Sequence, residues 1–228
     1  MRARDPLVGP VLTAHHCAAR LAFTREHRNW QVHHWHPVLF TDESRFTLTD
    51  VKSLWRRCGE SYAASNIIQH DQFCIRSVMT WGGIYLEDRT HRHVLANGTL
   101  NAVRYRDEIL RPIIRPYAGA VGPGFLLVQD NAQPRVARVC RQFLDDTGID
   151  AIDWPSSSSD LNPIQNLWVV MCLCIWCCQV VPQTVQELTD AQIQFWEEIP
   201  QDTIYRLIRS MPRHCQECIQ ACGGHTHY

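Results

Sequence analysis

The sequence predicts an α/β domain in which helices flank a mixed central sheet. Three strand-like segments come first, at residues 36–48, 74–86 and 89–98. After them, helix-like and strand-like segments alternate, at residues 100–117, 124–130, 134–148, 149–154 and from 160 onward. A meander of three strands followed by βαβα units is the order expected for such a sheet.

Local residue patterns support the later elements. The segment 124–130 is almost entirely apolar, as expected for a strand that is buried on both faces. The segment 100–117 has helical periodicity, and the segment 134–148 reads as a helix that ends at a Gly148 cap. Pro163 favours the first turn of the helix that follows.

The pattern divides the chain into three parts. Residues 1–36 mix basic, histidine and proline residues around one short helical segment and are interpreted as an interdomain linker. Residues 37–182 hold the predicted sheet and its helices. Residues 183–228 form a helical extension with two predicted helices, at 184–199 and 201–221.

Bulk composition is that of one globular domain with appendages. The 228 residues are 45% apolar, with a mean hydropathy of -0.24 and a net charge of -1, so no strong field indicates a nucleic-acid partner. The longest apolar run, Leu167 to Cys178, has 12 residues, whereas about 20 are needed to span a bilayer. Eleven cysteines without a recognisable signal peptide predict a reduced compartment.

Two aspartates are expected near the C-terminal ends of predicted strands, where ligands gather in α/β sheets. Asp42 follows the apolar start of the first strand, and Asp130 ends the segment 124–130. Carboxylates at adjacent strand ends suit Mg²⁺, and two such ions about 4 Å apart can catalyse phosphodiester chemistry. A single aspartate at a strand end is more often a cap or turn residue, so both interpretations stay open at this point.

A series of motifs along the chain shifts this balance towards the metal site. In order they are LFTDESRFTL, WRRCGESY, SVMTWGGI, LNAVRYRDEILRP, VQDNAQPRVAR, WPSSSSDLNPIQNLW and SMPRHCQECIQACGGHTHY. Together they resemble the Tc/mariner superfamily of DDE transposases over essentially the whole chain. The resemblance implies an RNase H-like fold. It also implies cleavage of DNA at transposon ends and joining of the 3′-hydroxyl to target DNA, with Mg²⁺ or Mn²⁺ as cofactor.

The resemblance, applied motif by motif, implies that Asp42 and Asp130 are the first two catalytic acids and metal ligands. The family's third acid lies in an SPDLNPIE motif, which reads SSSDLNPIQ here, so the third position is Gln165, with 34 residues between it and Asp130. Glutamine has one oxygen acceptor, no negative charge, and an NH₂ group that cannot ligate a cation. We therefore expect weaker metal binding, and DNA cleavage that is lost or reduced by about two orders of magnitude or more. Replacing Gln165 by glutamate is expected to restore a trace of strand transfer.

No neighbouring acid is expected to replace the missing one. Asp160 belongs to the same motif and is expected to cap the following helix through backbone N–H groups. Glu43 follows Asp42 directly, so strand alternation is expected to turn its side chain to the opposite face.

Three arginines are candidate DNA contacts. Arg56 and Arg57 match a hairpin excursion that contacts DNA or a partner subunit in some relatives, although a β-turn with exposed arginines explains them equally well. Arg135 stands where many relatives have histidine. It is expected either to meet a phosphate or to be a solvated helix residue.

The resemblance also implies DNA as a partner, action in the nucleus and a possible homodimer. In the family, paired helix-turn-helix modules precede the catalytic domain, and none is recognisable before Asp42, so we expect DNA binding to be non-specific at most.

Cysteines and histidines of the tail have ligand-like spacing, but the tail fits the family's ending, and we do not expect structural zinc. These residues are Cys215, Cys218, Cys222, His225 and His227.

The leading hypothesis is a transposase-derived endonuclease and strand-transferase domain that is catalytically impaired because its third acid is missing. One alternative is a non-catalytic module that uses the same fold to hold DNA or protein. Another is a non-functional transposon relic. Strand-transfer activity, salt-resistant DNA affinity and solubility distinguish the three hypotheses.

Overall fold

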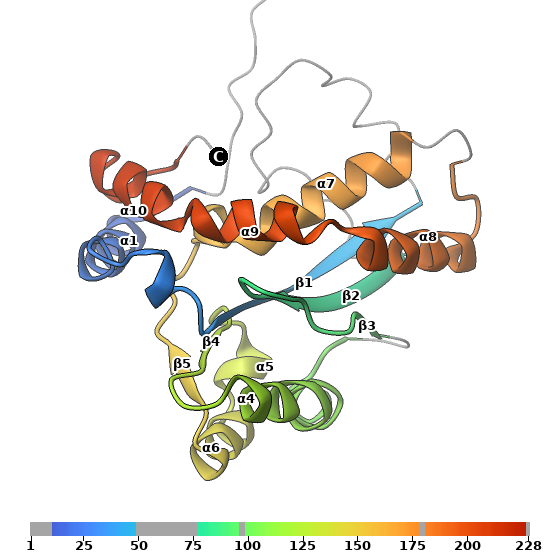
Figure 1. Cartoon of the computed structure of the whole chain (residues 1–228), viewed down its shortest axis with the longest axis horizontal. Coiled ribbons are helices and arrows are strands. Elements are labelled where there is room, and N and C mark those ends of the chain that lie inside the picture. Colours follow the sequence, from blue (N-terminus) through green and yellow to red (C-terminus); the bar gives the residue numbers. More distant parts are fainter. Residues whose placement is uncertain (1–10, 49–76, 96–98, 178–180, 227–228) are drawn as a thin grey trace, which may run out of the picture.

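The computed structural model describes residues 11–48, 77–95, 99–177 and 181–226, and it confirms the predicted mixed sheet (Figure 1). The sheet has five strands in the order β3-β2-β1-β4-β5. β1 pairs antiparallel with β2, as does β2 with β3, whereas β4 pairs parallel with β1 and with β5. The strands are β1 (Val38–Thr47), β2 (Ser77–Ile84), β3 (His93–Leu95), β4 (Leu126–Val128) and β5 (Asp150–Ile152).

Helices form a layer on each side of this sheet (Figure 1). One layer contains α7 (Pro163–Cys177), α8 (Val185–Glu198) and α9 (Gln201–Arg209). The other contains α3 (Ala102–Arg104), η3 (Tyr105–Ile114), α4 (Arg115–Val121), α5 (Gln133–Val136) and α6 (Arg138–Thr147). At one end of the molecule α1 (Ala14–Glu26) packs against α10 (Met211–Gln220). Two short 3₁₀ turns complete the described elements, η1 (Val32–His34) and η4 (Ser159–Leu161).

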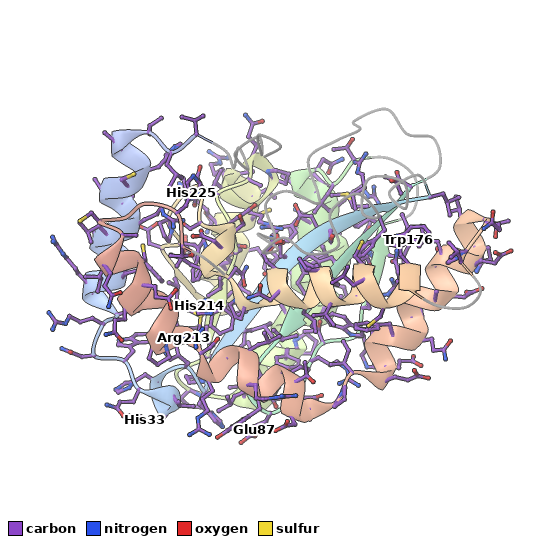
Figure 2. All side chains as sticks on the ribbon, turned by 90° about the horizontal axis from the view of Figure 1, so that it is seen from above. His33, Glu87, Trp176, Arg213, His214 and His225 are labelled. Carbon is purple, nitrogen blue, oxygen red and sulfur yellow. The ribbon has the colours of Figure 1, made fainter. Side chains whose placement is uncertain are left out.

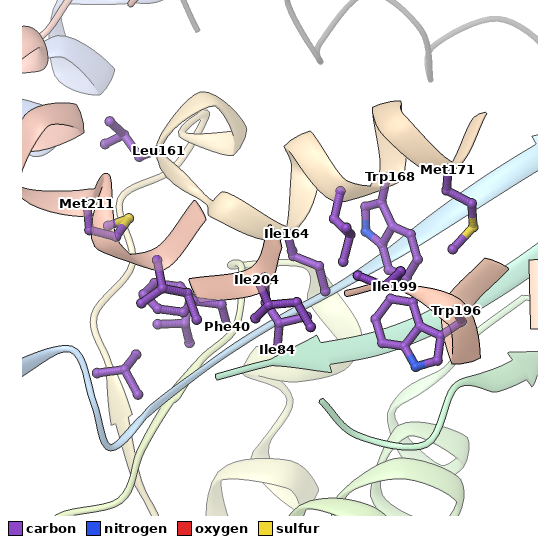
Figure 3. Packing of buried hydrophobic residues seen from close by; sticks show 14 of the residues in the cluster. Phe40, Ile84, Leu161, Ile164, Trp168, Met171, Trp196, Ile199, Ile204 and Met211 are labelled. Carbon is purple, nitrogen blue, oxygen red and sulfur yellow. The ribbon is translucent and has the colours of Figure 1, made fainter. Parts of the chain in front are cut away.

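Alternating side chains of the central strand build a separate core on each face of the sheet. Phe40 belongs to the core beneath α7, α8 and α9, and Leu39 belongs to the core on the opposite face. In the first core the rings of Trp168 and Trp196 stack at 5.2 Å between centroids (Figure 3). A Cβ atom on Gly82 would lie 2.7 Å from the Trp196 ring, so the stacked pair requires glycine at that position of β2.

The core explains the apolar sequence of α7, which resembles no amphipathic surface helix. Trp168, Met171 and Ile175 are all buried beneath it (Figure 3 labels the first two), and only Val170 and Cys174 of its described side chains are exposed. The helix therefore contributes most of its apolar side chains to the core. Among the described residues, none of the helices is both long enough and apolar enough to cross a membrane.

Three predicted helices are correct in place but wrong in detail. The helix at 100–117 has a π-helical middle, η3, with Pro112 inside it. The helix at 134–148 is interrupted at Ala137, whose ψ of 144° is extended, although Gly148 ends it in the predicted left-handed conformation. The helix at 201–221 is two helices that meet at Ser210. Pro112 inside η3 and Pro212 just after Ser210 each lack a backbone donor, which favours the irregularity at these two places.

His214 on α10 makes the stability of the fold depend on pH. It lies at the end of the molecule where α1 and α10 meet (Figure 2), and it is buried beside the Ser210 hydroxyl, 3.0 Å from Nε2. Burial lowers the pKa of His214 from 6.5 to about 4, and the attraction of Asp160 and Glu217 only partly offsets this. The folded chain therefore keeps His214 neutral where the unfolded chain would protonate it.

We expect the free energy of unfolding to fall by at most about 3 kcal/mol on account of His214 as the pH falls from 6.5 to 4. Well above pH 6.5 both states are neutral at this residue, so its contribution is constant there. Urea unfolding of the wild type and of His214→Gln between pH 4.5 and 7.5 measures the difference. The variant should show a shallower pH dependence over this range, and equal slopes would contradict the assignment.

Candidate active site

The sheet brings the two predicted acids close together, although only one of them lies at a strand end. Asp42 lies within β1 and not near its end as predicted, whereas Asp130 lies two residues after β4. Phe40 of β1 pairs with Val128 of β4 in parallel register, so two residues further on Asp42 and Asp130 lie at the same level. The Thr41 hydroxyl donates to the carbonyl of Val128 at 2.7 Å and ties the two strands together at this point. The first two positions of the predicted triad therefore come together through the pairing of β1 and β4.

The loop before α7 brings the third position to the same place. The Asn162 side-chain amide donates to the carbonyl of Thr41 at 3.2 Å, which fixes the start of α7 to β1. Gln165 lies in the first turn of α7, and its Nε2 donates a hydrogen bond to Asp42 Oδ2. The amide thus presents its donor group to the carboxylate with which a third acid would share a metal ion.

A buried arginine completes this cluster. Arg135 of α5 is 1% exposed; its Nη1 pairs with Asp130 Oδ1, and its Nη2 pairs with Glu43 and lies 3.8 Å from Asp42 Oδ1. Its guanidinium carbon lies 5.7 Å from the centre of the Tyr105 ring. Within the described residues its N–H groups have no acceptor in hydrogen-bond geometry, so charge attraction holds the group in place.

These contacts correct two expectations. Glu43 does not point away from the site, because its carboxylate shares Arg135 Nη2 with Asp42. Arg135 is not a solvated helix residue, since its side chain is buried among carboxylates. A phosphate contact by Arg135 stays a prediction that requires the guanidinium to leave these partners.

Burial controls the ionisation of the cluster. It raises the pKa of Asp42 to about 7; the nearby Asp130 charge acts in the same direction, and Arg135 opposes both. Burial also raises the pKa of Asp130, against the backbone N–H of Ala132 that donates to its carboxylate at 2.8 Å. The pKa of Arg135 is lowered by burial, with Asp42 acting against that shift. Asp42 is the deeper of the two acids, because its side chain is 9% exposed and that of Asp130 49%.

The side chains as arranged do not fit a divalent metal ion. A cation needs free oxygen lone pairs, whereas Asp42 faces an amide N–H of Gln165 on one oxygen and the guanidinium of Arg135 on the other. Among the described residues, no group of three or more His, Cys, Asp or Glu side chains is placed to hold a metal. This applies also to the tail cysteines and to His225, while His227 lies outside the described residues.

Two other predictions have different outcomes. Arg56 and Arg57 lie outside the described residues. Asp160 does not cap α7 as expected, because both of its carboxylate oxygens pair with Arg20 of α1, and Thr226 donates to Oδ2 at 2.7 Å. The sequence contained both arginines that pair with these acids, Arg135 five residues after Asp130 and Arg20 in the predicted helix of residues 1–36. Their positions in the sequence do not specify which acids they contact.

Comparisons with known proteins agree with this architecture. A family model described as DDE superfamily endonuclease matches residues 37–172. The Tcb2 transposase of Caenorhabditis briggsae is 31% identical over 235 residues, and the Tc1 transposase of Caenorhabditis elegans is 30% identical over 234. Both alignments cover 100% of this chain and 84% of the relative.

Solved structures show the same fold. The catalytic domain of Mos1 transposase with Raltegravir and Mg has a TM-score of 0.70 and 15% identity, covering 95% of this chain and 99% of that one. The Mos1 strand transfer complex has a TM-score of 0.76 and 15% identity, covering 98% of this chain and 66% of that one. The chain has the RNase H-like fold and belongs to the DDE superfamily endonucleases, among the Tc/mariner transposases.

Proposed function

We propose that this transposase catalytic domain has lost, or retains only weakly, the cutting and joining of DNA strands. One observation carries the proposal: the third-acid position is Gln165, and its amide donates to Asp42. The remaining acids, Asp42 and Asp130, are the two positions that the family motif assigns to catalysis. An amide in place of the third carboxylate removes one negative charge and replaces one of the two metal-binding oxygens by a hydrogen-bond donor.

The proposed partner is DNA, and the proposed reaction class is transfer of a phosphodiester bond. Relatives are named as transposases, and Mos1 has been solved as a paired-end complex with a left transposon end. Nuclear action, pairing of two copies and an Mg²⁺- or Mn²⁺-dependent ancestral reaction belong to the same proposal. The division into residues 1–36, 37–182 and 183–228 also stays a proposal, although α8 and α9 share a core with α7.

A strand-transfer assay tests this proposal. Wild type, Asp42→Asn and Tc1 transposase as a positive control are incubated with pre-cleaved Tc1 transposon-end duplexes, a target plasmid and Mn²⁺. We expect the wild type to give no more joined product than Asp42→Asn, because the site lacks its third acid. Efficient joining by the wild type that Asp42→Asn abolishes would overturn the proposal.

A binding measurement separates loss of chemistry from loss of DNA contact. Fluorescence anisotropy with the same duplex at several salt concentrations reports whether DNA is bound under the assay conditions. The strand-transfer comparison is made at a protein concentration where the duplex is bound. A wild type that binds but does not join DNA has then lost the chemical step.

A further inference from the structure

Arg135 places a positive charge where the acids of the site converge. Its two terminal nitrogens divide between the strands: Nη1 pairs with Asp130 after β4, and Nη2 lies with Glu43 and Asp42 of β1. A planar guanidinium with several donors suits this bridging of carboxylates. Because the group is 1% exposed, it is part of the packed interior and not a surface charge resting over the site.

The local charges make the arginine the counter-ion of the cluster. Asp42, Glu43 and Asp130 are the acids in contact with it. Carboxylates held this close to one another and partly buried need a positive charge among them. Arg135 supplies it from the chain itself, and the Tyr105 ring packs against the face of the guanidinium.

Gln165 and Arg135 each place a hydrogen-bond donor against Asp42, where a metal-binding site would need free carboxylate oxygens. Gln165 donates to Asp42 Oδ2, while Arg135 lies against Asp42 Oδ1, so both oxygens of the deepest acid face donors. A divalent ion placed between Asp42 and Asp130 would stand against the guanidinium nitrogens. Two cations do not share such a position, so the arginine and the ion exclude each other.

We propose that Arg135 is a built-in cation that replaces the divalent ion, and that it excludes Mg²⁺ and Mn²⁺ even when position 165 is returned to glutamate. The inference rests on the proposed function only in taking 42, 130 and 165 as the acid positions. A glutamate at 165 alone adds a negative charge beside Asp42 but leaves Arg135 in its contacts with Asp42, Glu43 and Asp130. Metal uptake then requires both changes, at 135 and at 165.

Binding of Mn²⁺ without DNA tests this. Electron paramagnetic resonance counts free Mn²⁺ in titrations of wild type, Gln165→Glu, Arg135→His and Arg135→His/Gln165→Glu. We expect no stoichiometric binding by wild type or Gln165→Glu, and a dissociation constant for the double variant at least about tenfold lower than for either single variant. Arg138→His in the Gln165→Glu background is the matched control, because Arg138 is exposed on α6 and makes the same charge change away from the cluster.

Each outcome decides the inference. Stoichiometric Mn²⁺ binding by wild type, or equal binding by Gln165→Glu and the double variant, would overturn it, as would a folded double variant that binds no Mn²⁺. If circular dichroism shows that the double variant is unfolded, Arg135→Met/Gln165→Glu takes its place, since methionine keeps an apolar stem over Tyr105 without the charge. A wild type that is inert in strand transfer yet binds Mn²⁺ overturns only this inference, and an active wild type overturns the proposed function.

Discussion

Replacing Arg135 by alanine is expected to lower the free energy of unfolding by about 3–5 kcal/mol at pH 8. The change removes the positive charge that contacts Asp42, Glu43 and Asp130 and leaves the Asp42 carboxylate buried without it. With Arg135 in place, the pKa of Asp42 is about 7, so the wild-type carboxylate is mostly ionised at pH 8. Removing Arg135 raises this pKa, so the loss includes the cost of protonating Asp42 or of keeping it charged. Urea unfolding followed by tryptophan fluorescence measures the loss.

A second change identifies the cause of that loss. Asp42→Asn removes the buried charge, so combining it with Arg135→Ala should recover a large part of the stability. Arg138→Ala, an exposed change on α6, is the control and should have an effect within about 0.5 kcal/mol. If Asp42→Asn gives no recovery, the stabilisation by Arg135 does not come from compensating the buried charge of Asp42.

Replacing Arg20 by alanine is expected to destabilise the fold by a similar amount, about 3–5 kcal/mol. Its side chain is 0% exposed and forms a bidentate pair with Asp160, with nitrogen–oxygen distances of 2.5 and 2.6 Å. It also donates to the carbonyls of Ser157, Gly223 and Gly224, each at 2.9 Å. One side chain thus joins α1, the loop before α7 and the end of the chain after α10.

The loss of Arg20 should also make the loop before α7, which leads to residue 165, more mobile, because Arg20 bonds to Ser157 and Asp160 in that loop. Hydrogen exchange of the amides in residues 156–166 is expected to accelerate in Arg20→Ala more than in β1 or β4. Arg25→Ala on the same helix is the control, because Arg25 is exposed. Unfolding curves for Arg20→Ala and Arg25→Ala that coincide would show that the pair with Asp160 contributes little.

Local sequence patterns were sufficient for the fold because each element carries its own signal. The apolar segment 124–130 contains the strand β4, and Gly148 ends α6 in the left-handed conformation that glycine tolerates. The mixed character of the sheet also followed from the sequence, whereas the strand order β3-β2-β1-β4-β5 comes from the structure. The π-helical turn over Pro112 and the break at Ser210 were missed because periodicity does not resolve how a helix accommodates a proline.

The site was predictable in position but not in its charge balance. Motif spacing placed residues 42, 130 and 165 together, as pairing of β1 with β4 and packing of α7 on β1 now explain. The role of Arg135 depends on tertiary contacts with residues 92 and 93 positions away in the sequence, Glu43 and Asp42. From sequence alone, Gln165→Glu was expected to restore a trace of strand transfer, whereas the proposed role of Arg135 requires a change at position 135 as well.

A crystal structure of the wild-type chain grown with Mn²⁺ tests the central claim most directly. Anomalous scattering locates Mn²⁺ independently of how the side chains are placed. We predict no anomalous peak between Asp42 and Asp130, with the Arg135 guanidinium in contact with both acids. A peak at that position, with Arg135 turned away from the carboxylates, would contradict the account.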